Sequence, residues 1–263
     1  MDSSIPAELE RICLRALSKR ASDRYATAAE FAEDLLSWQQ GPQQETRHQQ
    51  IVPKGLRSFD ADDADFYLDL LPGPRSRDGL PEGIHFWKTR IEETDPEKTF
   101  SIGLIYGPSG CGKSSLVKAG LLPRLSPDVT AIYLEATPSD TETRILRGLR
   151  KNVPELPNDI GLVETFTLLR RKKGRKVVVV LDQFEQWLHG KRDEQRRELV
   201  RTLRQCDGGR VQCIVMVRDD FWLAISRFLR ELEVRLLEGH NSELVDLFDL
   251  DHSRKVLAAF GRA

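Results

Sequence analysis

Apolar residues along the chain follow two spacings, and their succession predicts the order of strands and helices. Five runs have the length and the β-branched or apolar content of strands: 102–106, 129–136, 177–181, 211–217 and 242–250. Apolar residues recur every three or four positions, as on one face of a helix, in 83–93, 113–121, 139–149, 162–170, 192–206, 221–229 and 251–260. Strands that alternate with helices predict an α/β fold with a five-stranded parallel sheet between two helical layers.

The N-terminal part of the chain has a different pattern. A helix is predicted from Ile5 to Leu17, and a second one from Ala26 to Trp38, where Thr27 and Glu30 form a capping box. Residues 41–58 are mostly polar and aperiodic, which is typical of a linker. We therefore expect a short helical segment at 1–40, a linker at 41–58 and the α/β domain at 59–263.

Composition narrows the class of protein without identifying it. The chain has 40 basic and 41 acidic residues and a formal net charge of −1, so no overall field favours nucleic acid. It lacks an apolar run of membrane-spanning length and a recognisable signal peptide. Its four cysteines have neither metal-site nor disulfide spacing. We expect a cytoplasmic protein without a membrane segment.

The residues between the first strand and its helix carry the strongest chemical signal. Gly107-x-x-x-x-Gly112-Lys113-Ser114 is the phosphate-binding loop pattern, placed between a strand and a helix as that motif requires. Glycines let backbone N–H groups approach phosphate oxygens, while the lysine reaches the β- and γ-phosphates and the serine hydroxyl binds Mg²⁺. The predicted nucleotide-binding residues are Gly107, Pro108, Ser109, Gly110, Cys111, Gly112, Lys113, Ser114 and Ser115.

Three further residues follow buried strands and complete the candidate site. Asp182 ends the continuous apolar run 177–181, where a carboxylate can hold Mg²⁺ together with Ser114. Glu185 is the candidate to orient or deprotonate an attacking water, the alternative being a solvent-facing residue in the first turn of a helix. Arg218 ends the 211–217 strand and is a candidate sensor of the γ-phosphate, the alternative being an ion pair with Asp219 or Asp220. Lys113, Asp182, Glu185 and Arg218 are thus the candidate catalytic residues.

Weaker signals flank these motifs. The acids and aromatics of 59–68 predict a short helix whose Phe66, Tyr67 and Leu70 pack on the core. Arg75 and Arg77 are candidates for contact with the nucleotide. The basic run 170–176 is typical of a solvated helix end. Ser139 and Glu142 have the spacing of a capping box at the start of one predicted helix, and Asp251 is the expected cap of the last helix.

Residues 5–38, IPAELERICLRALSKRASDRYATAAEFAEDLLSW, resemble the last two helices of bacterial serine/threonine protein kinase domains. In that family, the arginine corresponding to Arg24 pairs with an acid of the activation segment. The glycine-rich loop, the strand lysine, HRD and DFG of such kinases are absent here, so protein kinase activity is not expected. The resemblance implies a kinase-related fragment or a kinase-encoding sequence upstream.

Residues 59–263 resemble the nucleotide-binding domain of bacterial STAND proteins, the signal-transduction ATPases with numerous domains. The resemblance rests on GPSGCGKSSLVKAGLLPRL (107–125), VVVVLDQFEQWL (177–188) and VQCIVMVRDDFWLAI (211–225). It implies that Lys113 and Ser114 bind phosphate and Mg²⁺, that Asp182 holds Mg²⁺ and that Arg218 is the sensor. The Gly-Arg-Glu usual before the first strand is not evident, and the family continues beyond this point into a helical and winged-helix lid.

Two functions of different classes follow from these signals. The first is a Mg·ATP-binding switch in signal transduction that hydrolyses ATP slowly or not at all, so that enzymatic activity stays open. The second is a nonenzymatic, kinase-related fragment that acts as an interaction module through protein partners or self-association. A small-molecule kinase is less favoured, because no acceptor lid is recognisable. ATP is preferred to GTP because no N-K-x-D motif is present.

Overall fold

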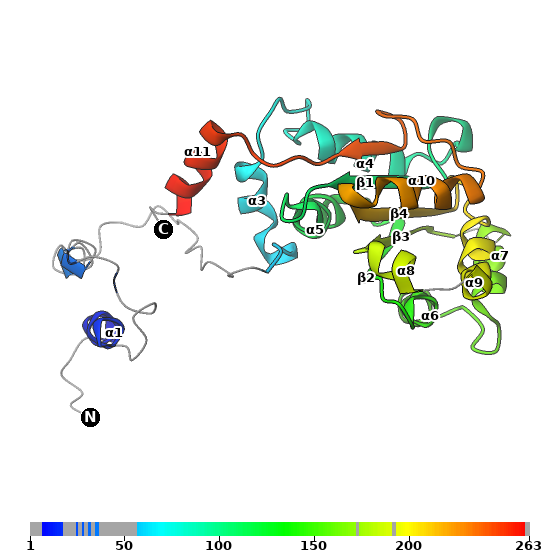
Figure 1. Ribbon diagram of the computed structural model, residues 1–263, viewed down its shortest axis with the longest axis horizontal. Coiled ribbons are helices and arrows are strands. Elements are labelled where there is room, and N and C mark those ends of the chain that lie inside the picture. The colour runs from blue at the N-terminus through cyan, green and yellow to red at the C-terminus, as the bar shows by residue number, and fades with distance from the viewer. Residues whose placement is uncertain are drawn as a thin grey trace. The chain divides into compact units, whose positions relative to one another are not determined.

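The computed structural model describes residues 7–17, 25, 28, 31–32, 35–36, 57–171, 174–190 and 193–260. The chain divides into two compact units, one within residues 1–52 and the other within 53–262 (Figure 1). In the first unit, helix α1 (Ala7–Ala16) agrees with the predicted N-terminal helix and buries Ile12. Most of the second predicted helix, Ala26–Trp38, lies outside the described residues.

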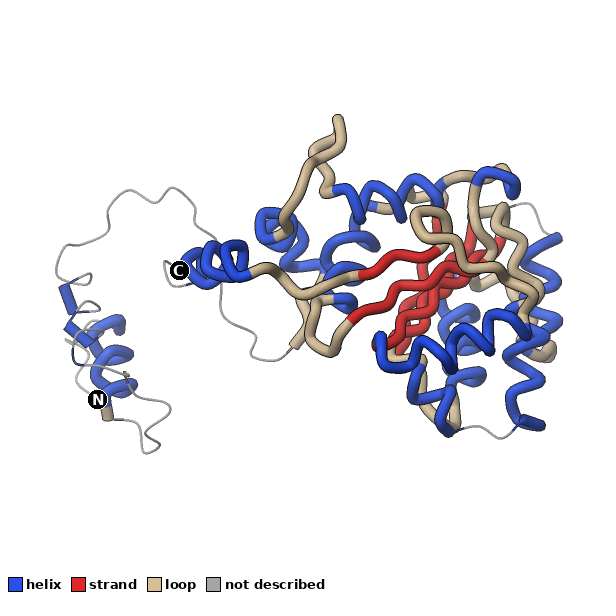
Figure 2. Tube along the Cα trace, turned by 45° about the horizontal axis from the view of Figure 1, so that its top comes forward, coloured by secondary structure: helices blue, strands red, loops and turns tan. Residues whose placement is uncertain are grey.

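The second unit is built on one parallel sheet, as the strand and helix pattern predicts. Its strands stand in the order β2-β3-β4-β1-β5, shown in red in Figure 2. They are β1 (Ile102–Gly107), β2 (Val129–Glu135), β3 (Lys176–Asp182), β4 (Val211–Arg218) and β5 (Ser242–Leu244). Every residue of β3 is buried, which explains its nearly unbroken apolar sequence. All carboxyl ends lie at one edge of the sheet, because all pairings are parallel.

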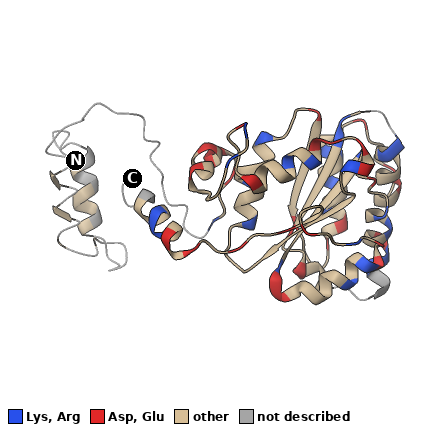
Figure 3. Ribbon diagram, turned by 90° about the horizontal axis from the view of Figure 1, so that it is seen from above, with Lys and Arg blue, Asp and Glu red and all other residues tan. Residues whose placement is uncertain are grey.

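Helices cover both faces of the sheet and close two hydrophobic cores. The larger core packs one face of the sheet against α6 (Thr141–Asn152), α7 (Leu162–Arg171), α8 (Glu185–Gly190), α9 (Asp193–Leu203) and α10 (Trp222–Glu231). On the other face, α4 (Glu82–Glu92) contributes Trp87 and Ile91, and the segment after the phosphate loop contributes Val117 and Leu121. Figure 3 shows acidic and basic residues interspersed over the helices, in keeping with the balanced charge.

Shorter elements connect these strands and helices. Helix α3 (Ala64–Leu70) follows a short turn of 3₁₀ helix at Ala61–Asp63 and buries Tyr67 and Leu70, as predicted, whereas Phe66 is only half-buried. Further 3₁₀ turns lie at Pro96–Lys98, Leu122–Arg124 and Asp219–Phe221. The last helix, α11 (Leu250–Phe260), reaches back to α3 through a hydrogen bond between His252 Nε2 and the Leu70 carbonyl, 2.6 Å long.

The helix after the phosphate loop is not the regular helix that its apolar spacing predicts. Helix α5 covers only Lys113–Ser115, and a π-helix follows at Leu116–Leu121. Gly120 lies so close to Ile84 that an added Cβ would come within 2.7 Å of its Cδ1. Pro123 then prevents a regular continuation, since proline lacks the N–H group that a helix needs.

Four other expectations need correction. The last strand covers only Ser242–Leu244 rather than 242–250, and Asp249, not Asp251, caps α11, because Asp249 Oδ1 accepts a hydrogen bond from the His252 N–H. Helix α6 has no side-chain cap at its start, and Glu142 instead accepts a hydrogen bond from Trp187 Nε1 at 3.0 Å. Lys176 of the basic run is buried at the start of β3 rather than solvated.

Candidate functional site

The phosphate loop joins β1 to α5 at the carboxyl edge of the sheet. Gly110 and Gly112 have φ angles of +80° and +95°, in the left-handed region that favours glycine. No atom lies within 4 Å of a Cβ added at Gly110, so the loop faces open space there. Gly107 is required for another reason, because a Cβ would lie 1.9 Å from the Val245 carbonyl oxygen. The loop is therefore a cradle of backbone atoms, and the segment after β5 packs closely against it at Gly107.

Lys113 lies over this cradle. Its ammonium donates to the carbonyl oxygens of Gly107 and Pro108, each at 2.8 Å, and lies 3.7 Å from the Cys111 sulfur. These partners all belong to the loop itself. A phosphate in the cradle would meet a charge that is already in place and half-buried.

Ser114 and Asp182 meet although 68 positions separate them in the sequence. Ser114 Oγ donates to Asp182 Oδ2 at 2.6 Å, and Asp182 is 3% exposed. The backbone turns sharply after Asp182, because Gln183 adopts a φ of +51°, and its N–H donates to Asp182 Oδ1 at 2.8 Å. A hydroxyl and a carboxylate are the oxygen ligands that Mg²⁺ prefers, with water and phosphate oxygens completing its shell, so the pair fits a magnesium ion.

Glu185 begins α8 and is buried, so the solvent-facing alternative is wrong. Burial raises the pKa of Glu185 and the nearby Asp182 carboxylate adds to the rise, while a hydrogen bond from the Arg218 backbone opposes it. Its Oε2 atom has no hydrogen-bond partner among the described residues. A buried carboxylate oxygen without a partner is costly for the fold, which is typical of a group kept for a ligand or a water.

Arg218 forms an ion pair instead of facing the loop with a free guanidinium. Its Nη2 lies 2.5 Å from Asp220 Oδ2, and the guanidinium lies 5.7 Å from the centre of the Phe221 ring. This is the pairing that the sequence leaves as the alternative. A sensor role for Arg218 requires that it exchange this partner for a nucleotide, and that role stays a prediction.

Tyr133 is a site residue that sequence reasoning missed. It lies on β2, next to β3, and its hydroxyl donates to Asp182 Oδ2. Burial raises the pKa of Tyr133 well above its ordinary value, and the Asp182 carboxylate adds to the rise, so the phenol keeps its proton. The only sequence signal is a tyrosine near the end of a predicted strand. That signal gains meaning only once β2 is known to flank β3.

A pocket of about 490 Å³ opens directly beside the phosphate loop. Its walls come from three parts of the chain: Phe59, Tyr67, Leu70 and Leu71 near α3; Gly110, Cys111, Gly112, Ser115 and Leu116 of the loop; and Val245 to Phe248 with Ser253 and Val256 near α11. The Phe59 N–H donates to Ser115 Oγ at 3.1 Å and so ties the first wall to the loop. Mostly apolar walls and this volume suit a flat aromatic base.

Arg75 and Arg77 do not line this pocket. They border a separate hollow with Pro74, Ser76, Asp78, Glu82 and His85. Arg75 donates to the carbonyl oxygens of Gly79 and Leu68 at 3.2 Å and 2.7 Å, which holds its own loop together. The expectation that these arginines contact a nucleotide finds no support in this geometry.

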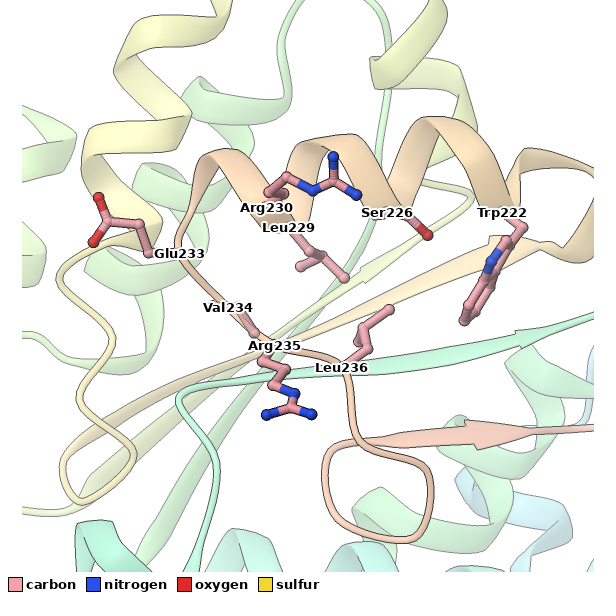
Figure 4. Close-up of a pocket in the computed structure, with 8 residues that line it drawn as sticks. All are labelled: Trp222, Ser226, Leu229, Arg230, Glu233, Val234, Arg235 and Leu236. Carbon is pink, nitrogen blue, oxygen red and sulfur yellow. The ribbon is translucent and has the colours of Figure 1, made fainter.

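A third cleft, of about 460 Å³, runs along α10 (Figure 4). Trp222, Leu229 and Leu236 give it an apolar wall, and Ser226, Arg230, Glu233, Val234 and Arg235 complete its lining. Trp222 also packs against Tyr106, with ring centres 4.8 Å apart. No residue of the phosphate loop lines this cleft, so it is separate from the candidate site.

Two negative findings concern the described residues only. They contain no group of three or more His, Cys, Asp or Glu side chains arranged to hold a metal, which includes the aspartates of 60–65. Over the same residues, no helix has both the length and the apolar character needed to cross a membrane.

Comparison with known proteins places the chain in a family. The family described as Novel STAND NTPase 1 matches residues 54–259. Among solved structures, that of the Aeropyrum pernix ORC2 protein in its ADPNP-ADP complexes has a TM-score of 0.51. The match has 16% identity and covers 73% of this chain and 54% of that one. The Walker-type ATPase paby2304 of Pyrococcus abyssi has a TM-score of 0.49 and 16% identity over 72% of this chain and 60% of that one. The chain thus spans little more than half of each. No curated protein matches the sequence.

Proposed function

The chain belongs to the Novel STAND NTPase 1 family, and from this premise we propose that it binds Mg·ATP and acts as a nucleotide-dependent switch. The observation that carries the proposal is the contact between Ser114 and Asp182, 2.6 Å long, beside a lysine and a glycine cradle. The glycine cradle, the lysine and the Ser114–Asp182 pair lie together at one edge of the sheet. Phosphate recognition requires the first two, and metal recognition requires the third.

Each residue of the site has a task in this proposal. The loop N–H groups and Lys113 hold the phosphates, and Ser114 and Asp182 hold the metal. Mg²⁺ held there would supply positive charge against the negative charge of the phosphate oxygens. The pocket bordered by Phe59, Tyr67 and Val245 receives the adenine, which gives the base the apolar contacts that the sequence left unassigned.

Glu185 is proposed to accept the proton of an attacking water. Its raised pKa makes it a better base than a solvent-exposed carboxylate, and its unpaired Oε2 is free to bind that water. Arg218 is paired with Asp220 and would have to leave this partner before it could contact the γ-phosphate. We infer slow hydrolysis from this, because an arginine at the γ-phosphate accounts for a large part of the rate in related chemistry.

The proposal is tested by equilibrium binding of Mg·ATP and by phosphate release. Lys113→Ala should abolish measurable binding. Glu185→Gln should bind ATP as tightly as the wild type and release phosphate about a hundredfold more slowly or not at all. Lys98→Ala, which removes an exposed lysine before the amino end of β1, at the opposite end of that strand from the loop, is the matched control. A wild-type chain that does not bind Mg·ATP would overturn the proposal.

A second role, as an interaction module, is favoured by apolar side chains on the surface. Leu250, Leu257 and Leu223 are 80%, 68% and 63% exposed, on helices α11 and α10. Exposed apolar groups of this kind suit a contact with another domain, a partner or a second copy. We propose that such a contact transmits the nucleotide state in a kinase-linked signalling protein, in which residues 1–40 are the remnant of the C-terminal lobe of a kinase domain. A sedimentation measurement with and without Mg·ATP tests for self-association.

A further inference from the structure

The magnesium site contains one polar contact that the proposed tasks do not use. Asp182 Oδ2 accepts hydrogen bonds from two hydroxyls, that of Ser114 and that of Tyr133. Ser114 belongs to the phosphate loop, whereas Tyr133 comes from β2, on the other side of β3. The Asp182 carboxylate is therefore hydrogen-bonded from both sides of β3, by the phosphate loop and by β2.

We propose that Tyr133 is a positioning residue that sets the Mg²⁺ requirement of nucleotide binding by fixing the Asp182 carboxylate. The inference rests on the proposed binding of Mg·ATP. An ionised carboxylate offers about four lone pairs. Ser114 and Tyr133 take two at Oδ2, and the Gln183 N–H takes one at Oδ1, which leaves one directed position on Oδ1 for the metal or its water.

The tyrosine is itself held in place by the π-helix that follows the phosphate loop. Lys118 Nζ lies 4.7 Å from the centre of the Tyr133 ring, 3.7 Å from Glu135 Oε1 and 3.2 Å from Ser58 Oγ. A cation over an aromatic face restricts the ring. The π-helix that directly follows Lys113 and Ser114 thus also restricts the Tyr133 ring. The phosphate loop, the Tyr133 hydroxyl and the Asp182 carboxylate are therefore linked as one unit.

The competing explanation is that this hydroxyl only joins β2 to β3. It is tested with Tyr133→Phe, which removes the hydroxyl and keeps the ring. ATP binding is measured by calorimetry as Mg²⁺ is titrated, and again in excess chelator. We expect the Mg²⁺ concentration for half-maximal binding to rise about tenfold, since a hydrogen bond to a charged group is lost. Binding of ATP without metal should not change.

A matched control and a double variant separate positioning from stability. Tyr106→Phe removes a hydroxyl from β1, beside Trp222, and should leave the Mg²⁺ requirement unchanged. Ser114→Ala and Tyr133→Phe should combine to less than the sum of their effects, because both act through Asp182 Oδ2. If Tyr133 acted on the fold alone, adding Tyr133→Phe to Ser114→Ala would leave the Mg²⁺ requirement of Ser114→Ala unchanged.

Three results would overturn the inference. An unchanged Mg²⁺ requirement in Tyr133→Phe, with a lower melting temperature, would assign the hydroxyl to the fold alone. A lower Mg²⁺ requirement would mean that the tyrosine competes with the metal. A wild-type chain that binds no ATP at any Mg²⁺ concentration would remove both this inference and the proposed function, whereas the first two results leave the proposed function intact.

Discussion

Two lysines, at opposite ends of the same sheet, show how differently this protein uses a buried or half-buried cation. Lys176 begins β3 at the amino edge, is 4% exposed and donates to the Glu93 carbonyl, 83 positions away in the sequence. Lys113 stands at the carboxyl edge, and its carbonyl partners, Gly107 and Pro108, are six and five positions away.

The difference separates a structural cation from one kept for a ligand. Lys176 ties together two distant parts of the chain, so its bond forms only when the fold forms and is part of its stability. Among the described residues, the hydrogen bonds of Lys113 go only to its own loop, so it can exchange those carbonyls for phosphate without losing a bond to a distant part of the chain. Burial lowers the pKa of Lys176 to about 8, because the interior disfavours the charged ammonium. The other interactions of the fold compensate for this unfavourable free energy.

The largest expected effect concerns Lys113→Met. In thermal unfolding, saturating Mg·ATP should stabilise the wild type by about 2.7 kcal/mol at a hundred times its Kd, and should not stabilise the variant. Without nucleotide, the two proteins should unfold at nearly the same temperature, because the lost bonds are local. A clear loss of stability in the nucleotide-free variant would contradict the distinction drawn between the two lysines.

The next effect concerns Lys176→Ala, which should destabilise the fold and leave the binding of Mg·ATP intact. It removes a buried side chain and leaves the Glu93 carbonyl without this partner, so unfolding by urea should reveal a loss of about 2 kcal/mol. Stabilisation by Mg·ATP should persist at its wild-type size. If ATP no longer stabilised this variant, Lys176 would belong to the binding machinery as well.

A third effect is the pH dependence that Lys176 brings. The unfolded chain keeps the lysine proton up to its ordinary pKa of about 10.4, whereas the folded chain releases it near pH 8. Between these values the unfolded state binds more protons, so the free energy of unfolding should rise with pH, by at most about 1.4 kcal/mol per pH unit. Lys176→Met should lack this rise. The difference between the two proteins, measured from pH 7.5 to about 10, isolates it from other groups, and an identical dependence in both would contradict it.

Much of the site follows from local pattern. The loop between Gly107 and Ser114 and the acid after a buried strand at Asp182 are each readable from a short stretch, because phosphate and metal chemistry require those residue types next to particular elements. Strands β1, β3 and β4 are also predictable, since burial on both faces demands continuous apolar sequence. The short β5 and the π-helix at Leu116–Leu121 are not, because they result from close packing against neighbours distant in sequence.

The sequence was least informative about which partner each polar side chain takes. Arg218 could face a ligand or Asp220 with the same local sequence, and the fold selects Asp220. Glu142 has the spacing of a capping residue and bonds Trp187 instead. Such choices depend on the competition among all donors and acceptors within reach, which a single stretch of chain does not contain.

By itself, the sequence determined the α/β class, the phosphate loop and the acid that accompanies it, because these depend on residue type and on neighbours along the chain. Only the tertiary structure decided that Ser114 and Tyr133 both donate hydrogen bonds to the Asp182 carboxylate. It also decided that the walls of the pocket come from both α3 and the segment after β5. The residues that line this pocket lie as much as 197 positions apart in the sequence, from Phe59 to Val256, and only the order of strands in the sheet and the packing of helices on it bring them together.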